Sequence, residues 1–346
     1  RKPAVVKTYE TDIPRYLVPP FARRRRPTVE ERLVALAEFS EQFEHNRVEE
    51  GATDVGVSAS GVAYQYAREV LPYATFLRLA MSNQFPVNMA REFCARFDSV
   101  YVIEEGEPFI EVQLKLSGIT NIVGKEKIPL MGELNPEILA QAIFDAPIPA
   151  SYNSEVPIPP RPPLFCLGCP HRGVFYVLKK MMKQNVVALG DIGCYTLGLN
   201  MGAVDTVLCM GAAVGQAAGF YHAYRNEENP PDIIATIGDS TFFHAGIPPL
   251  IDAVVQKIPF VLVILDNRTT AMTGNQPTPA TGIGARGEVT ATVDIEAIVK
   301  GCGVNFIKTG DPYLLDEFIP VLKAAIRYSK ENGPAVVVAR HPCILD

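Results

Sequence analysis

The chain has 346 residues, of which 48% are hydrophobic and 20% charged, a balance typical of a soluble globular protein with room for two domains. Its net charge of −6 gives no reason to expect a nucleic-acid partner, and its longest apolar runs are too short to cross a membrane. Seven cysteines, an odd number in a chain with no export signal, argue against a disulfide scaffold and favour a cytoplasmic location.

Residues 1–50 predict a polar lead-in that is first extended and then helical. We expect residues 1 to about 30 to be extended, and we interpret Arg23–Arg26 as a solvated or interface strap rather than a localisation or phosphate-binding patch. Apolar residues recur at helical spacing over 29–46, which predicts a helix there.

Strands and helices alternate over 51–145 and predict a small three-layer α/β domain. The expected strands are 54–58, 75–80, 99–104 and 121–123, and the expected helices are 63–71, 87–97 and 108–117. We interpret Glu104 and Glu105, at the end of a strand, as a solvated turn rather than catalytic acids. Seven prolines in 146–164 predict a stiff linker, so the domain boundary is placed there.

Residues 165–346 predict a second domain with a doubly wound parallel sheet. The expected strands are 186–189, 206–209, 233–237, 260–265, 304–307 and 335–339; the expected helices are 173–183, one ending at 224, 244–256, one near 295, and 314–328. Gly282, Gly284 and Gly287 match the letters of a dinucleotide-binding fingerprint. They follow no strand and open no helix, so we interpret them as part of a mobile loop.

The stretch Asp232–Gly274 carries the strongest functional signal. One apolar run ends at Gly238-Asp239-Ser240 and the next ends at Asp266-Asn267, so both motifs fall at the carboxyl ends of parallel strands, where open α/β sheets bind ligands. Oxygens from Asp239, Asn267 and a loop carbonyl such as that of Thr269 suit a hard cation, and the following helix start can receive phosphates. The residues therefore suggest a Mg²⁺–diphosphate site, with a βαβ unit and polar turns as the alternative.

Four cysteines form a second candidate site. Cys166 and Cys169 make a C-x-x-C, Cys194 lies in a glycine-rich turn, and Cys343 follows the last strand. Four thiolates can bind Zn²⁺ or a [4Fe–4S] cluster, while a redox pair or unreactive thiols remain open on the residues alone. Two histidines beside these motifs, His171 and His244, are candidates for acid–base groups or for packing roles.

Two segments resemble elements of thiamine diphosphate enzymes. Their motif opens with Gly-Asp-Gly or Gly-Asp-Ser, as at 238–240, and closes with an Asn pair, of which the first is replaced here by Asp266. The resemblance implies that Asp239, Asn267 and the Thr269 carbonyl bind Mg²⁺. Met210-Gly211 resembles the element whose bulky residue holds the cofactor in a V shape, with the carbonyl of Leu208 binding the pyrimidine.

As a set, the motifs resemble the large (α) subunit of indolepyruvate:ferredoxin oxidoreductase over nearly the whole chain. These motifs are CLGCPHRG, GDIGCYTLG, MGAAVGQAAG, GDSTFFHAG and LDNRTTAMTG, with VIEEGEPFIEVQL in the first domain. The resemblance implies oxidative decarboxylation of a 2-oxoacid such as indolepyruvate to an acyl-CoA, with thiamine diphosphate, Mg²⁺ and ferredoxin. It also implies a transketolase C-terminal-like first domain and a hetero-oligomer with a smaller β- or γ-type subunit.

The same resemblance assigns the four cysteines, 166, 169, 194 and 343, to a [4Fe–4S] cluster next to the cofactor. The family's α subunit also has a pyrimidine-binding domain, which supplies the activating Glu, and usually a ferredoxin-like domain. Neither is found between Arg1 and Asp346, so we expect this chain alone to be incompetent for turnover. The alternatives are a non-oxidative thiamine-dependent decarboxylase and a non-catalytic scaffold.

Overall fold

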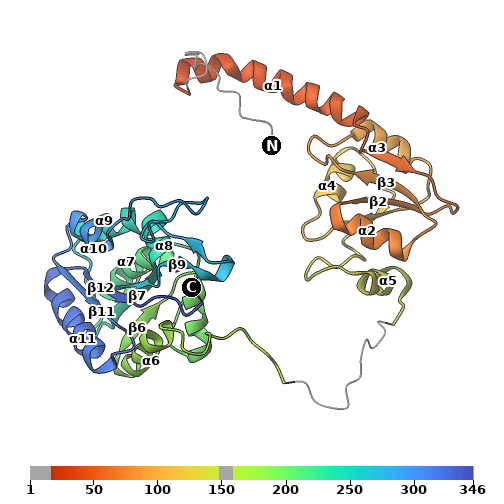
Figure 1. Cartoon of the computed structure of the whole chain (residues 1–346). Coiled ribbons are helices and arrows are strands. Elements are labelled where there is room, and N and C mark those ends of the chain that lie inside the picture. The colour runs from red at the N-terminus through yellow and green to blue at the C-terminus, as the bar shows by residue number, and fades with distance from the viewer. Residues whose placement is uncertain (1–16, 148–158, 346) are drawn as a thin grey trace. The chain divides into compact units, whose positions relative to one another are not determined.

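The computed structural model describes residues 17–147 and 159–345, and its contacts divide the chain into two units, Arg1–Ile158 and Pro159–Asp346 (Figure 1). The division falls inside the proline-rich stretch 146–164, most of which lies outside the described residues, as do residues 1–16. Each unit has its own five-stranded sheet with helices on both faces, so the predicted α/β fold class is confirmed.

The sheet of the first unit has the order β1-β3-β2-β4-β5, in which only β1 is antiparallel. Its strands are Arg47–Glu49 (β1), Gly56–Ser60 (β2), Thr75–Leu79 (β3), Val100–Ile103 (β4) and Ile122–Val123 (β5). The helices Gly61–Val70 (α2) and Pro136–Phe144 (α5) cover the face that contains Phe76, whereas Val87–Cys94 (α3) and Phe109–Leu116 (α4) cover the face that contains Leu77. Successive strand residues point to opposite faces, which produces the three predicted layers.

The expectation of an extended N-terminal stretch was wrong for residues 19–30. Pro19–Gln42 (α1) is one 24-residue helix, and Arg23–Arg26 lies on it. Pro19 and Pro20 occupy the first turn, where a missing N–H costs no hydrogen bond, and Arg26 pairs with Glu30 one turn further on. The prolines therefore start this helix rather than prevent it, although Pro27 lies in its interior.

The sheet of the second unit is entirely parallel, in the order β11-β12-β8-β7-β6. Its strands are Val186–Leu189 (β6), Asp232–Gly238 (β7), Val261–Asp266 (β8), Phe306–Gly310 (β11) and Ala335–Arg340 (β12). His171–Met181 (α6) and Leu315–Asn332 (α11) cover one face; Ala212–Tyr224 (α7), Ile247–Val255 (α9) and Ile295–Gly301 (α10) cover the other. This is the predicted doubly wound arrangement.

The central strand β8 shows why these residues form a buried parallel sheet. Every residue from Val261 to Asp266 is buried, as expected for a strand covered by helices on both faces. Val263 packs with α6 and α11, whereas Leu262 and Ile264 pack with α7 and α9. Burying each such side chain contributes about 1.5–3 kcal/mol, so the pattern strongly specifies the sheet.

The predicted strand over 206–209 does not form, so the sheet has five strands rather than six. Only Thr206 makes an isolated bridge, to Leu189. Asp205 occupies the adjoining edge of β6, because its N–H donates to the Ala188 carbonyl at 2.7 Å and its carboxylate accepts the Ala188 N–H at 2.8 Å. The chain then leaves the sheet, and Leu208 is exposed.

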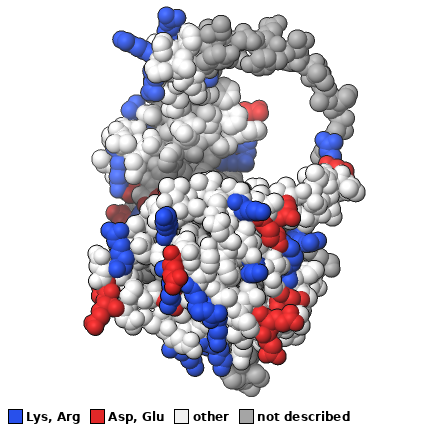
Figure 2. Space-filling view, turned by 90° about the vertical axis from the view of Figure 1, so that its left-hand side faces the viewer, with Lys and Arg blue, Asp and Glu red and all other residues white. Residues whose placement is uncertain are grey.

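Several short elements complete the second unit. They are the 3₁₀ segments Met182–Gln184, Cys194–Met201 and Ala271–Thr273, the short helix Asp239–Thr241 (α8), the π-helix Phe242–Gly246, and the paired strands Thr269–Thr270 (β9) and Gln276–Pro277 (β10). None of the described helices is long and apolar enough to cross a membrane. Basic and acidic side chains are interspersed on the face that Figure 2 shows.

Candidate functional site

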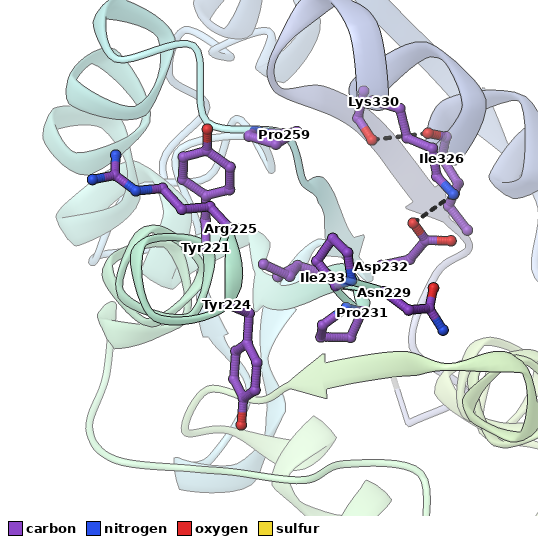
Figure 3. A pocket seen from close by; sticks show the side chains of 12 residues that line it. Tyr221, Tyr224, Arg225, Asn229, Pro231, Asp232, Ile233, Pro259, Ile326 and Lys330 are labelled. Atoms are coloured by element: carbon purple, nitrogen blue, oxygen red, sulfur yellow. Dashed lines mark hydrogen bonds and ion pairs between the residues drawn. The ribbon is translucent and has the colours of Figure 1, made fainter. Parts of the chain in front are cut away.

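A cavity of about 120 Å³ lies at the carboxyl ends of β7 and β8, where the sequence predicts a ligand site. Its lining includes seven of the predicted site residues: Cys194, Met210, Gly238, Asp239, Ser240, Asn267 and Thr269. A larger cavity of about 380 Å³ lies at the opposite end of β7, near Tyr221, Tyr224 and the Asp232–Lys330 ion pair (Figure 3). It contains none of the predicted residues, so the smaller cavity is the candidate site.

Asp239 is a buried carboxylate at the start of α8. Its Oδ1 accepts the Ser240 N–H at 2.8 Å, and its Oδ2 accepts the Thr278 hydroxyl at 3.4 Å. Burial raises the pKa of Asp239 to about 7, and the neighbouring Asp266 charge adds to this rise. Within the described residues, no Lys or Arg forms an ion pair with Asp239, so a bound cation would supply the missing positive charge.

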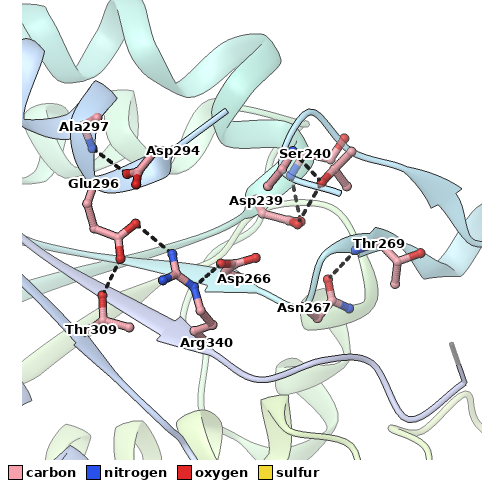
Figure 4. Close-up of polar contacts among 12 residues, drawn as sticks. Asp239, Ser240, Asp266, Asn267, Thr269, Asp294, Glu296, Ala297, Thr309 and Arg340 are labelled. Atoms are coloured by element: carbon pink, nitrogen blue, oxygen red, sulfur yellow. Dashed lines mark hydrogen bonds and ion pairs between the residues drawn. The ribbon is translucent and has the colours of Figure 1, made fainter. Parts of the chain in front are cut away.

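Asn267 and Thr269 are buried beside Asp239 and complete a set of oxygen donors (Figure 4). Between them, Arg268 has a left-handed backbone conformation with φ of 62°, which turns the chain sharply after β8. A carboxylate, an amide oxygen and a carbonyl are hard ligands of the kind that Mg²⁺ prefers. No group of three or more His, Cys, Asp or Glu side chains is arranged to bind a metal ion in the described residues. The donor set proposed here is of another kind, because Asp239 is its only residue of these four types.

Tyr195 and Asp191 belong to the site, although the sequence analysis did not assign them a role. The Tyr195 hydroxyl donates to the Ile192 carbonyl at 2.8 Å and lies 3.2 Å from the Thr241 hydroxyl. A Cβ atom on Gly238 would lie 2.5 Å from the Tyr195 ring, which explains the glycine of the Gly-Asp-Ser motif. The only signal for Asp191 was a second Gly-Asp pair at a strand end.

Asp191 fixes the segment that carries Met210. Its fully buried carboxylate accepts the Gly211 N–H, with both oxygens 2.9 Å from the nitrogen. Gly211 has a φ of 86°, and a Cβ there would lie 2.6 Å from Cβ of Ala245 in the π-helix, so this position requires glycine. Met210 lines the cavity as predicted, whereas Leu208 does not.

The two candidate histidines differ in placement. His171 is buried and lines the cavity, and burial lowers its pKa to about 4, so the ring is neutral at physiological pH. His244 is exposed on the π-helix and does not line the cavity.

All four predicted cysteines line one further cavity of about 50 Å³. The Cys169 N–H donates to the Cys166 carbonyl at 3.2 Å, which forms the C-x-x-C turn, and the Cys343 N–H donates to the Asn267 carbonyl at 3.2 Å. Burial, followed by neighbouring thiols, raises the pKa of Cys194. In the described chain these thiols are not arranged at metal-binding distances from one another. Four thiols are nevertheless a donor set that suits an iron–sulfur cluster or Zn²⁺.

The 120 Å³ cavity at Asp239 (the cofactor cavity) and the 50 Å³ cavity at the four cysteines (the cysteine cavity) share one wall. His171, Cys194, Asn267 and Ala271 line both of them. A group bound by the four cysteines would therefore lie next to a ligand bound at Asp239.

Comparison with known proteins identifies the class. Residues 191–339 match the family described as "Thiamine pyrophosphate enzyme, C-terminal TPP binding domain". This range contains the Asp239 and Asn267 motifs and the segment around Met210. The second unit is therefore similar to the cofactor-binding domain of thiamine pyrophosphate enzymes.

The sequence relatives are more specific. The chain is 39% identical, over 97% of its length, to indolepyruvate oxidoreductase subunit IorA of Archaeoglobus fulgidus, and 36% identical, over 95%, to IorA of Methanothermobacter marburgensis. It covers 56% of each relative and so spans about half of their length. The chain is homologous to this part of the indolepyruvate oxidoreductase α subunit, which confirms the resemblance drawn from the motifs.

Among solved structures, a 2-oxoglutarate:ferredoxin oxidoreductase from Magnetococcus marinus, with 2-oxoglutarate, coenzyme A and succinyl-CoA bound, is 19% identical to the chain. The TM-score is 0.45, and the match covers 56% of this chain and 66% of that one. This similarity is too weak to assign a function.

Proposed function

We propose that the chain is the cofactor-binding part of an enzyme that oxidatively decarboxylates a 2-oxoacid of the arylpyruvate class to an acyl-CoA. The electrons pass to ferredoxin, and the active enzyme includes further domains or a smaller partner subunit. Thiamine diphosphate supplies the electron sink for decarboxylation when it is bound. The observation that carries the proposal is the shared wall between the cofactor cavity and the four-cysteine cavity.

Asp239, Asn267 and the Thr269 carbonyl are proposed to hold Mg²⁺ and, through it, the diphosphate. Gly238 and Ser240 lie at the start of α8 and border the same space. Two observations support this assignment. Asp239, Asn267 and Thr269 are all buried, and no cationic side chain in the described chain pairs with the Asp239 carboxylate. Met210 is proposed to support the cofactor from the adjoining wall, while the cavity gives no support to a role for Leu208 or His244.

The four cysteines are proposed to hold a [4Fe–4S] cluster as the first electron acceptor. A bound cluster displaces the thiol protons, so the raised pKa of Cys194 is a property of the metal-free thiol. An acceptor beside the cofactor separates an oxidative enzyme from a simple decarboxylase, which requires no electron acceptor.

The test is an anaerobic assay of the native assembly, with CoA and a one-electron dye as acceptor. We expect 2-oxoacid-dependent dye reduction, faster with indolepyruvate or phenylpyruvate than with pyruvate or 2-oxoglutarate. Cys194→Ser should abolish reduction, whereas Cys302→Ser, a half-buried cysteine outside both cavities, should not. Release of CO₂ without dye reduction would instead indicate a non-oxidative decarboxylase, and failure to bind thiamine diphosphate a scaffold.

A further inference from the structure

Asp266, which replaces the first Asn of the thiamine motif, is not part of the lining of the cofactor cavity. Asn267 lines the cofactor cavity, whereas the adjacent Asp266 does not, and lines a separate cavity with Glu296 and Arg340. Asp266 is only 2% exposed, and its Oδ1 has no hydrogen-bond partner among the described residues. A carboxylate buried in this way requires a compensating positive charge.

Arg340 supplies that charge from the end of the neighbouring strand. Arg340 is the register partner of Asp266 in the β12–β8 pair, and its Nε lies 2.6 Å from Asp266 Oδ2. Its other arm lies 2.7 Å from Glu296 Oε2, and the Thr309 hydroxyl donates to Glu296 Oε1 at 2.7 Å (Figure 4). The planar guanidinium can engage both carboxylates at once, which an ammonium group cannot do in the same way.

The residues after Arg340 hold both proposed ligand sites. The His341 N–H donates to the Asp266 carbonyl at 3.1 Å, and the Cys343 N–H donates to the Asn267 carbonyl at 3.2 Å. The segment 340–343 is therefore bonded along the loop that carries the metal-binding oxygens, and it brings Cys343 to the cysteine cavity.

The same segment also reaches the C-x-x-C turn. The His341 ring lies 4.0 Å from the Tyr313 ring, and its Nδ1 lies 3.0 Å from Asp311 Oδ2. The Tyr313 hydroxyl donates to the carbonyl of Gly168, between Cys166 and Cys169. A displacement of the segment 340–343 would therefore move residues on both sides of the cysteine cavity.

We propose that Arg340 is a positioning residue. By pairing with Asp266 and Glu296, it fixes the segment 340–343 against the loop after β8, so that the Asn267 oxygen and the Cys343 thiol are positioned together. Arg340 does not line the cofactor or cysteine cavity and so acts through its neighbours. The inference rests on the proposed function for the identity of the two bound groups.

The test is a double-mutant cycle in the assembled native protein, with Arg340→Met, Asp266→Asn and both changes together. The readouts are the dissociation constant of thiamine diphosphate with Mg²⁺, measured by calorimetry, and the bound iron per chain. Arg340→Met should weaken cofactor binding by at least about tenfold and lower the iron content, because Asp266 is left buried without its counter-charge. The matched control is Arg327→Met, an exposed arginine on α11.

The double variant separates positioning from a general loss of folding. With Asn at 266 the buried carboxylate that Arg340 neutralises is gone, so affinity should return to within about threefold of the wild type, which simple additivity would not give. Arg340→Lys should be intermediate. Arg340→Met that behaves like Arg327→Met, or a double variant as weak as Arg340→Met, would overturn the inference while the proposed function stands. A wild-type protein that binds no thiamine diphosphate would overturn both.

Discussion

Asp239 is the residue on which the proposed metal site depends most. Its carboxylate is buried at an electrostatic cost that a divalent cation would offset. We predict that Asp239→Asn weakens Mg²⁺-dependent binding of thiamine diphosphate by at least about 100-fold. Thermal unfolding of the cofactor-free protein should show no loss of stability, because the substitution removes a buried charge. Loss of stability without loss of binding would contradict a metal-binding role.

Gly238 is a second residue whose identity follows from a contact. A methyl group at Gly238 would enter the Tyr195 ring, whereas Gly215, in the interior of α7, has open space around it. Gly238→Ala should lower the free energy of unfolding by about 1–3 kcal/mol. Gly215→Ala should instead raise it by about 0.5–1 kcal/mol, because alanine favours the helix. Denaturant unfolding of the two variants checks both signs.

At the scale of elements, long apolar segments were predictable and short or edge segments were not. β7 and β8 are buried on both faces, so their composition alone identifies them. The segment 206–209 has the same apolar character but was misassigned, since side-chain and backbone bonds of Asp205 occupy the edge of β6. α5 was not predicted, although Asn135 caps it and Pro136 opens it.

Helix α4 provides a prediction on pH. Its residue Glu111 is buried, which raises the pKa, but hydrogen bonds from Lys115 at 2.5 Å and from the Lys125 N–H at 2.8 Å outweigh burial and lower it below 4.5. Because the pKa is lower in the folded state, this stabilisation is present above about pH 4.5 and is lost as the pH falls through the folded value.

Glu111→Gln should therefore reduce the free energy of unfolding by about 1–2 kcal/mol at pH 7 and make the acid limb of the stability curve less steep. Glu69→Gln, at an exposed position of α2, is the matched control and should leave the acid limb unchanged. Equal acid limbs for wild type and Glu111→Gln would contradict this account.

At the scale of the whole molecule, the sequence predicted the fold class and most of the cavity-lining motifs. Asp239 and Asn267 could be predicted because each follows a buried strand, and parallel strands bring such ends together. Tyr195, Thr278 and Arg340 could not be predicted, because each acts through a contact with a distant segment that leaves no spacing signal. The role of His244 was inferred from proximity in sequence, and that of the Leu208 carbonyl from the resemblance to thiamine diphosphate enzymes. Neither residue lines the cavity.

Cofactor binding should slow hydrogen–deuterium exchange in the second unit and not in the first. At a free cofactor concentration about 100 times the dissociation constant, the binding domain gains about 2.7 kcal/mol. Hydrogen–deuterium exchange with thiamine diphosphate and Mg²⁺ should slow in peptides covering 191–195, 238–241 and 267–273 and remain unchanged in the sheet of the first unit. Equal protection in both units would contradict binding at the described cavity.

We propose that an iron–sulfur acceptor lies beside a thiamine diphosphate site. The most direct test is electron paramagnetic resonance of anaerobically purified, dithionite-reduced native protein, with iron and sulfide determined on the same sample. We predict a reduced [4Fe–4S] signal that is lost in Cys166→Ser and Cys194→Ser and kept in Cys302→Ser. Iron-free protein that still binds thiamine diphosphate would contradict the claim and leave a non-oxidative decarboxylase.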